Sequence, residues 1–262
     1  CGGSRAEVRQ AGGGYEVPAL VPAWGNLHEG GWSLLRQARP LGDVVVASIL
    51  VKRLQFLPHE DFDTYPRTWE ADCQALQAAG CDVLFAPGEQ ELYPEPQTYR
   101  VQPPAELADI LECHFRPGFF VGVSTVVMKL FACVQPRVAV FGQKDYQQLM
   151  VIRGMVRQFA LPIAVLGVAT LRAADGLALS SRNNYLTPLE RAEAVHLSQS
   201  LQQMAQALRA GTLDIAALEQ QAMVDLTARG WQPDYLAARR RADLQVPAAD
   251  EVAALVQNDG LV

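Results

Sequence analysis

The chain has 262 residues, of which 50% are hydrophobic and 19% are charged. This length allows one large domain or two smaller ones with ample core, and the composition is that of an ordinary globular protein. The formal net charge is −6 and Arg239–Arg241 is the only run of basic residues, which argues against a protein that binds nucleic acids.

The five cysteines are scattered along the chain, odd in number and without Cys-x-x-Cys spacing. This pattern favours a reduced cytosolic protein over a disulfide scaffold or a zinc site. No apolar run reaches the roughly 18 residues that a membrane span needs, and no signal-peptide pattern is present. We therefore expect a cytoplasmic protein without a membrane partner. The chain begins at Cys1 and not at Met, so we expect that it lacks its natural beginning.

The first predicted strand is the apolar run Val17–Val21, and the break after it carries Pro22 and Gly25. Apolar residues with helical spacing follow from Trp32 onward. His28 lies at the start of this predicted helix, where backbone N–H groups and the helix dipole favour an anion. The stretch is typical of a phosphate-binding turn, although a histidine at such a place can also be structural.

Strands and helices continue to alternate after this turn. The β-branched run over residues 43–51 suits a strand buried on both faces of a parallel sheet. Further strands are predicted over 82–86, 138–141 and 163–168, and helices over 67–80, 123–135 and 145–159. Residues 88–104, rich in proline, predict an irregular connection. This alternation predicts an α/β fold with right-handed crossovers, whose ligands sit beyond the carboxyl ends of the strands.

The alternation ends after about residue 170. Two helical stretches, 188–210 and 214–229, precede a strand-like segment over 234–238. We therefore predict a domain boundary near residues 168–172, which separates a domain over 1–170 from a smaller one over 171–262.

Two groups of polar residues follow predicted strand or turn ends. Lys144 comes directly after a strand that closes at Gly142, where its ammonium would meet a phosphate if the sheet binds a nucleotide. Its neighbours Asp145 and Gln148 have the spacing of a helix capping box, so these two residues could serve the helix start instead of a ligand. That alternative does not account for Lys144.

The second group is Ser180, Ser181, Arg182 and Asn183, which follow a turn at Asp175–Gly176. They could cap a helix, but Thr187–Glu190 already has the pattern of a cap. Two hydroxyls and a guanidinium are therefore left for other work, and they are well suited to binding phosphate oxygens.

Gln55 follows the strand predicted over 43–51, so it also reaches the carboxyl edge of the sheet. It is either a loop hydrogen bonder or a ligand contact. Lys52 and Arg53 beside it are either solvated or placed to attract an anionic substrate. The other three histidines lie far apart in the sequence and form no metal-binding pattern.

Several blocks occur together in one order: VPAWGNLHEG, LQF, YPRTWEADC, DVLFAP, RPG with GVSTVV, VAVFGQKDYQQL and DGLALSSRNNYL. In these blocks the chain resembles the pantothenate synthetase (pantoate–β-alanine ligase) family, which belongs to the nucleotidyltransferase superfamily with the His-x-Gly-His signature. The resemblance runs from about Val17 to Leu236, and its last two blocks are highly specific together.

The resemblance implies a Rossmann-like domain over residues 1–170, an α+β lid domain over 171–262, and a homodimer. It also implies Mg²⁺ and a two-step reaction of ATP, pantoate and β-alanine. The pantoate carboxylate attacks the α-phosphate of ATP, giving pantoyl adenylate and pyrophosphate, and the amine of β-alanine then displaces AMP. Cations and helix-start N–H groups would stabilise the charge on phosphate oxygens, and a closed lid would protect the adenylate from water.

The same resemblance implies roles for particular residues. The catalytic residues would be His28, Lys144 and Arg182. Pantoate would bind Gln55 and Gln148. No residue is assigned as a metal ligand. The ATP contacts would be Trp24, Gly25, His28, Gly31, Gly142, Lys144, Asp145, Leu171, Leu179, Ser180, Ser181 and Arg182.

The chain departs from the family pattern at several of these places. Gly31 stands where the family has its second signature histidine, usually described as the proton donor. Trp24 replaces a methionine, Lys52–Arg53 replace Asn-Pro, and Phe119 replaces a histidine. The family's usual ending, with Arg-Leu-Ile-Asp-Asn, is absent after Val262.

Loss of one positioned proton donor typically costs on the order of 10²–10⁴ in rate. We therefore predict that the chain is impaired as a pantothenate synthetase. Two alternatives stay open. One is a related ATP-dependent amide ligase with a different acid or amine, for which Lys52 and Arg53 would bind a more anionic substrate. The other is a non-catalytic or re-engineered binding protein, in which Trp24 and Phe119 would line or fill the site.

Overall fold

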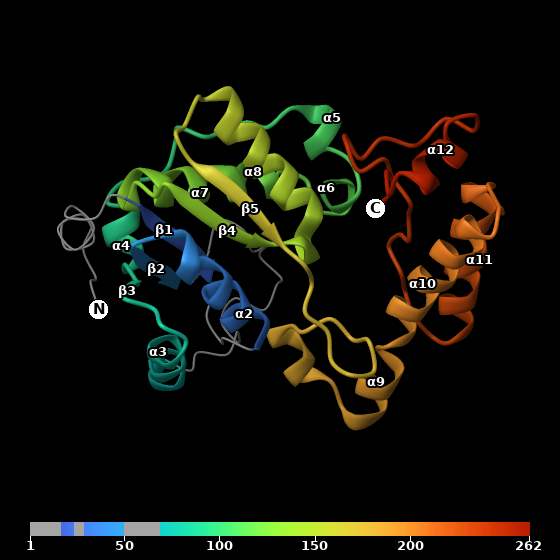
Figure 1. Cartoon of the computed structure of the whole chain (residues 1–262), viewed down its shortest axis with the longest axis horizontal. Helices are drawn as coiled ribbons and strands as arrows, with labels where there is room; N and C mark the ends of the chain where they lie inside the picture. Colours follow the sequence, from blue (N-terminus) through green and yellow to red (C-terminus); the bar gives the residue numbers. More distant parts are fainter. Residues whose placement is uncertain (1–16, 24–28, 50–68) are drawn as a thin grey trace. The chain divides into compact units, whose positions relative to one another are not determined.

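The computed structural model describes residues 17–23, 29–49 and 69–262 (Figure 1). The described residues form two compact units. The first comprises those up to Asp109, Arg116–Leu171 and Leu179–Ser181. The second comprises Ile110–Phe115, Arg172–Ala178 and Arg182–Val262.

The first unit is built on a five-stranded parallel sheet with the strand order β3-β2-β1-β4-β5. This confirms the predicted α/β fold with a parallel sheet. The buried β-branched run Val44–Val46 explains why β2 takes an inner place in the sheet, because both faces of the strand are covered. The strands are β1 (Pro18–Ala23), β2 (Val44–Ile49), β3 (Val83–Phe85), β4 (Val138–Gly142) and β5 (Ala164–Val168).

Helices cover both faces of the sheet (Figure 1). On one face lie α2 (Glu29–Ala38) and α3 (Trp69–Ala78), and on the other lie α7 (Phe119–Val134) and α8 (Tyr146–Gln158). The helix α2 turns Leu35 and Ala38 onto the sheet, as the helical spacing predicts. The core on this face consists of Ala19, Val21, Leu35, Ala38, Val45, Ala47, Leu76, Leu84 and Val140.

Short helices were missed by the sequence pattern. Residues 88–104 are mostly irregular, as predicted, but they begin with α4 (Glu89–Leu92). Two more single turns follow, α5 (Ala105–Ala108) and α6 (Glu112–Phe115), and a 3-10 helix, η1 (Arg39–Leu41), follows α2. One turn of helix is too short to show a 3.6-residue hydrophobic period, so the sequence carries little signal for it.

The second unit is largely helical, with α9 (Pro188–Glu193), α10 (His196–Arg209), α11 (Ile215–Ala228) and α12 (Val252–Gln257). The single helix predicted over 188–210 is wrong, because α9 ends at Glu193 and α10 begins at His196. Side chains at the break bind the preceding backbone: Ser198 Oγ donates to Val195 O at 2.9 Å, and His196 Nδ1 lies 2.9 Å from Glu193 O. Apolar spacing continues across the break, so the sequence pattern does not reveal it.

The strand predicted over 234–238 is also wrong. Leu236 and Ala238 are buried, and they pack in the core of the second unit with residues of α10, α11 and α12. Within the described part of this unit, the β-pairings are isolated antiparallel bridges, Arg172–Ala178 and Arg240–Leu261. The apolar residues of 234–238 therefore serve packing without a strand ladder.

Candidate active site

The sheet reverses its strand order between β1 and β4. The chain moves from β1 outward through β2 to β3, and then returns to the other side of β1 to form β4 and β5. The register joins Ala19 to Val138 and Leu20 to Ala139, while β1 runs on to Ala23 and β4 to Gly142. In an open α/β sheet, ligands bind in the crevice beyond the carboxyl ends of strands at such a switch point.

One predicted group of site residues lies at the carboxyl end of β4. Gly142 closes the strand, Lys144 and Asp145 lie in the 3-10 helix η3 (Gln143–Asp145), and Gln148 lies in the first turn of α8. Lys144 Nζ is 3.5 Å from Asp145 Oδ1, and 43% and 61% of the two side chains are exposed. An exposed pair of this kind contributes little, so the ammonium can turn toward an incoming anion.

The capping box considered for Asp145 and Gln148 is not formed. Asp145 is the N-cap residue of α8, but its side chain makes no capping hydrogen bond. Its backbone, with φ −102° and ψ 64°, continues the η3 turn instead of taking the extended geometry of a usual N-cap. The box expected at Thr187–Glu190 is confirmed, since Thr187 Oγ1 accepts from Glu190 N and Glu190 Oε2 accepts from Thr187 N.

The helix α2 begins at the same edge of the sheet. Its first residue, Glu29, follows β1 after a short connection, and α2 contacts both β1 and β4. Gly31 is the third residue of the helix, so it contributes backbone but no side chain to the first turn. The start of a helix favours an anion, and the negative charge of Glu29 in the first turn opposes this. Arg36 forms an ion pair with Glu29 and so offsets that negative charge.

Several predicted site residues lie outside the described residues. These are Trp24, Gly25, His28 and Gln55, together with Lys52 and Arg53. These residues belong to two connections between described elements: residues 24–28 join β1 to α2, and residues 50–68 join β2 to α3.

A hairpin brings Leu171 and Leu179 together. Leu179 N donates to Leu171 O at 3.0 Å, and Ala173 N donates to Leu177 O at 2.8 Å nearer the turn. The predicted turn at Asp175–Gly176 is confirmed, because Leu177 N donates to Asp175 Oδ1 at 3.2 Å and Gly176 has a φ of 93°. The hairpin thus places side by side two residues that the family resemblance assigns to ATP.

The serine-rich segment continues directly from this hairpin. Ser181 and Arg182 begin the 3-10 helix η4 (Ser181–Tyr185), in which Ser181 is buried and Arg182 is exposed. Asn183 Nδ2 donates to Ala178 O at 3.0 Å. The sequence interpretation included Asn183 in this group but gave it no role, although an asparagine just after a turn often bonds to nearby backbone.

The carboxylate of Asp175, in the hairpin turn, is stabilised in its ionised form by its neighbours. A hydrogen bond from the Arg191 guanidinium holds the pKa of Asp175 below its usual range, and the Leu177 N–H acts in the same direction. The carboxylate therefore stays ionised near neutral pH and holds the turn to α9.

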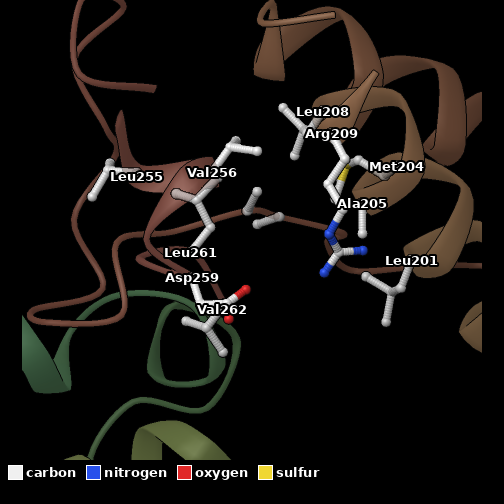
Figure 2. A pocket seen from close by; sticks show the side chains of 12 residues that line it. Leu201, Met204, Ala205, Leu208, Arg209, Leu255, Val256, Asp259, Leu261 and Val262 are labelled. Carbon is white, nitrogen blue, oxygen red and sulfur yellow. The ribbon is translucent and has the colours of Figure 1, made fainter. Parts of the chain in front are cut away.

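Among the described residues, two cavities are lined by residues of the second unit. One is mainly apolar, has a volume of about 250 Å³ and is lined by Leu201, Met204 and Leu208 of α10 and by the C-terminal residues Leu261 and Val262 (Figure 2). The other, of about 470 Å³, is polar and lies between α10 and α11. Neither contains a residue that the sequence motifs assign to the site.

Metal-binding clusters and membrane-spanning helices are both absent from the described residues. Residues 17–23, 29–49 and 69–262 contain no cluster of three or more histidine, cysteine or acidic side chains that could hold a metal ion. In the same ranges no helix is long and apolar enough to cross a membrane.

Comparison with known proteins identifies the family of the chain. The family model for pantoate-beta-alanine ligase matches residues 4–258. The chain belongs to the pantoate-beta-alanine ligase family. The match confirms the resemblance seen in the sequence motifs.

Individual members of the pantoate-beta-alanine ligase family are close in sequence. Pantothenate synthetase of Verminephrobacter eiseniae (strain EF01-2) is 63% identical over 251 residues, which cover 95% of this chain and 90% of that protein. Pantothenate synthetase of Leptothrix cholodnii (strain ATCC 51168 / LMG 8142 / SP-6) is 61% identical over 252 residues, covering 95% and 87%.

Solved structures of the pantoate-beta-alanine ligase family share the fold. Pantothenate synthetase of Thermus thermophilus superposes with a TM-score of 0.88 at 44% identity, covering 95% of this chain and 89% of that one. The Francisella tularensis ligase, solved with beta-gamma ATP and beta-alanine, has a TM-score of 0.78 at 33% identity and coverages of 87% and 85%.

Proposed function

We propose that the chain condenses pantoate with β-alanine at the expense of ATP, through a pantoyl-adenylate intermediate. The observation that carries this proposal is the family match over residues 4–258. The structure of the Francisella tularensis relative in complex with beta-gamma ATP and beta-alanine supports these substrates. The strand order at β1 and β4 supports a nucleotide site at the same edge of the sheet.

ATP would lie along the switch point, with its phosphates near the start of α2 and the end of β4. Lys144, on the turn after Gly142, supplies a mobile positive charge there, and Arg182 of η4 would supply a second one. Negative charge develops on the α-phosphate oxygens when the pantoate carboxylate attacks, so cations and helix-start N–H groups aimed at them lower the barrier. His28 belongs to the same turn by its place in the motif.

The remaining assignments complete the substrate site. Gln148, half-buried in the first turn of α8, and Gln55 would hold pantoate. The Trp24–Gly25 turn, Leu171 and the Leu179–Ser181 segment would contact ATP together with Asp145. The amine of β-alanine then attacks the carbonyl carbon of the adenylate, and AMP leaves with the bonding electrons of the anhydride.

Mg²⁺ fits these residues as a partner of the nucleotide. This ion is usually bound through one or two carboxylates together with substrate phosphates, without a dedicated protein cage. Asp145 offers an exposed carboxylate on the turn beside Lys144, and the described residues hold no group of three or more histidine, cysteine or acidic side chains that could bind a metal ion by itself. When bound, Mg²⁺ would neutralise phosphate charge during adenylation.

We expect this chain to catalyse adenylation more slowly than is usual in the family. Gly31 lies in the first turn of α2 and carries no proton donor where the family resemblance places a histidine. Loss of one such donor typically lowers the rate on the order of 10²–10⁴.

The domain arrangement is part of the same proposal. Residues 1–170 would bind ATP and pantoate, and residues 171–262 would close as a lid that keeps water from the adenylate. The presence of two compact units supports this division. The enzyme would work as a homodimer in the cytoplasm, for which sedimentation of the purified protein is the direct check of oligomeric state.

ATP–pyrophosphate exchange tests the proposal directly. The assay uses ATP, Mg²⁺, labelled pyrophosphate and a panel of carboxylic acids that includes pantoate. Exchange that requires pantoate, followed by pantothenate formation when β-alanine is added, is the expected result. Exchange with another acid alone would assign a related amide ligase, and ATP binding without exchange with any acid would assign a non-catalytic binding protein.

A further inference from the structure

One side-chain hydrogen bond closes the segment that carries four of the proposed ATP contacts. Asn183 Nδ2 donates to Ala178 O at 3.0 Å, and the bond is partly buried. The residues enclosed between these two are Leu179, Ser180, Ser181 and Arg182. The bond therefore spans the whole serine-rich segment.

Ala178 is a fixed point of the backbone. It forms an antiparallel bridge with Arg172, and the next residue, Leu179, donates its N–H to Leu171 O. The far end of the same hairpin is held by Arg191, which donates to Asp175 Oδ2 at 2.8 Å. The acceptor of the Asn183 bond is thus set by contacts on both sides of it.

Asn183 is held from the opposite direction. It lies in η4, where its own carbonyl accepts from Leu186 N at 3.2 Å. The chain then enters α9 through the capping box of Thr187 and Glu190. The side chain of Asn183 in η4 thus bonds to the hairpin at Ala178. This bond fixes the two ends of the segment Leu179–Arg182 relative to each other.

We propose that Asn183 is a positioning residue for ATP, which acts by holding Leu179–Arg182 in the shape that the nucleotide meets. This inference rests on the proposed function. A segment that is ordered before binding loses little conformational entropy when the ligand binds. The smaller entropy cost appears as a higher affinity for the nucleotide. One neutral hydrogen bond of this kind corresponds to roughly three- to tenfold in a binding constant.

The effect should be specific to one substrate. Without the Asn183 bond, the segment loses one of the contacts that fix its ends, and both the Kd and the KM for ATP should rise roughly three- to tenfold. The KM values for pantoate and β-alanine should stay within about twofold of the parent values, because the segment is not proposed to bind either of them.

The chain contains a matched control. Asn258 Nδ2 donates to Ala254 O at 2.9 Å, so it pairs the same two chemical groups within the second unit. Its position at the C-terminus of α12 is outside every proposed substrate contact. Asn258→Ala therefore removes a bond of the same kind without touching the serine-rich segment.

The experiment compares the full chain with Asn183→Ala, Asn183→Asp and Asn258→Ala. ATP affinity is measured by equilibrium dialysis with Mg²⁺, the three KM values in the exchange and synthesis assays, and folding by thermal melting. Asn183→Asp keeps the size of the side chain but cannot donate to a carbonyl, and its negative charge also opposes ATP, so it should weaken ATP binding at least as much as Asn183→Ala does. Asn258→Ala should bind ATP like the parent chain.

The outcomes separate the two proposals. If the parent chain binds ATP and both Asn183 variants bind it equally well, the positioning role is wrong while the proposed function stands. The role is also wrong if Asn258→Ala weakens ATP binding to the same degree, or if all three KM values rise together. A folded parent chain that binds no ATP overturns the proposed function, and the role of Asn183 with it.

Discussion

Arg191 Nη1 donates to Asp175 Oδ2 at 2.8 Å, and this bond ties the turn of the hairpin over 171–179 to α9. The same hairpin brings Leu171 and Leu179 into backbone contact and leads directly into the serine-rich segment. An ion pair outside the proposed substrate contacts thus holds the far end of the hairpin that leads into the serine-rich segment.

This ion pair predicts a pH dependence of stability. The pKa of Asp175 is lowered in the folded chain, first by the hydrogen bond from Arg191 and then by Leu177 N. A depressed carboxyl pKa contributes stability that is present above the unfolded value of about 4 and is lost as pH falls through the folded value. We expect the urea midpoint of the parent chain to fall more steeply than that of Asp175→Asn between about pH 5 and about pH 3.

Urea melts at several pH values measure this difference. Glu190→Gln serves as the control, because Glu190 also has a lowered pKa but is held by Thr187. That variant should keep the part of the slope that comes from Asp175. Equal slopes for the parent chain and Asp175→Asn would show that the ion pair does not bear on stability in acid.

Lys144→Ala should abolish most of the adenylation. Its ammonium is exposed on η3 and its ion pair with Asp145 is loose, so the fold should not depend on it. Loss of one group that stabilises developing charge typically costs on the order of 10²–10³ in rate, and we expect a loss of this size in ATP–pyrophosphate exchange. Arg157→Ala, which removes an exposed cation near the other end of α8, should leave exchange unchanged. A Lys144→Ala variant with parent activity would remove this residue from the mechanism.

Gly31→His should raise the rate of adenylation. The imidazole would stand in the first turn of α2, where the family resemblance expects a proton donor. The gain should be on the order of 10²–10⁴ in exchange rate if nothing else compensates for the glycine. Gly31→Ala is the matched control, since it improves helix propensity by roughly 1 kcal/mol but adds no donor. No gain from histidine over alanine would indicate that the site works without this group.

Gly42→Ala should destabilise the sheet. A Cβ at this position would lie 2.5 Å from Val17 O, just before β1, and 2.8 Å from Ala19 Cβ in β1. Val17 O also accepts from Asp43 N at 2.9 Å, so the strand cannot withdraw without breaking that bond. Forcing atoms into a packed core costs about 1–3 kcal/mol, and urea denaturation should show a loss of that size.

The control for Gly42 is Gly154, in the interior of α8. A Cβ there meets nothing within 4 Å. Gly154→Ala should therefore raise the free energy of unfolding by about 0.5–1 kcal/mol, because alanine restricts the unfolded chain and favours helix. If both substitutions change stability alike, the close approach at Gly42 is not what limits it.

Hydrophobic pattern was a good guide to the elements of the first unit. The largely apolar run of β2 and the helical spacing of α7 are local properties, and both elements formed, although α7 begins at Phe119 and not at the predicted residue 123. The pattern failed where local sequence allows two outcomes. It runs unbroken through Ala194 and Val195, where the chain turns between α9 and α10, and it cannot tell packed apolar residues at 234–238 from a strand.

Near the candidate site, signals from neighbouring residues predicted some of the turns and helix caps correctly. The Asp175–Gly176 turn and the Thr187–Glu190 cap depend on neighbouring residues, and both were predicted correctly. The capping box of Asp145 and Gln148 was one of two alternatives considered on the same grounds, and it is not formed, because the η3 turn that enters α8 sets the backbone of Asp145 in another conformation. Spacing alone does not reveal that preceding turn.

The sequence by itself determined the family, the alternation of strands and helices, and the polar residues available at the strand ends. These depend on residue types and on spacing within a few turns of chain. Tertiary structure alone decided that β4 pairs beside β1, which places the turn after Gly142 at the same switch point as the start of α2. It also decided that Asn183 reaches Ala178. Strand neighbours and side-chain partners are chosen by packing among distant segments, and no local pattern records that choice.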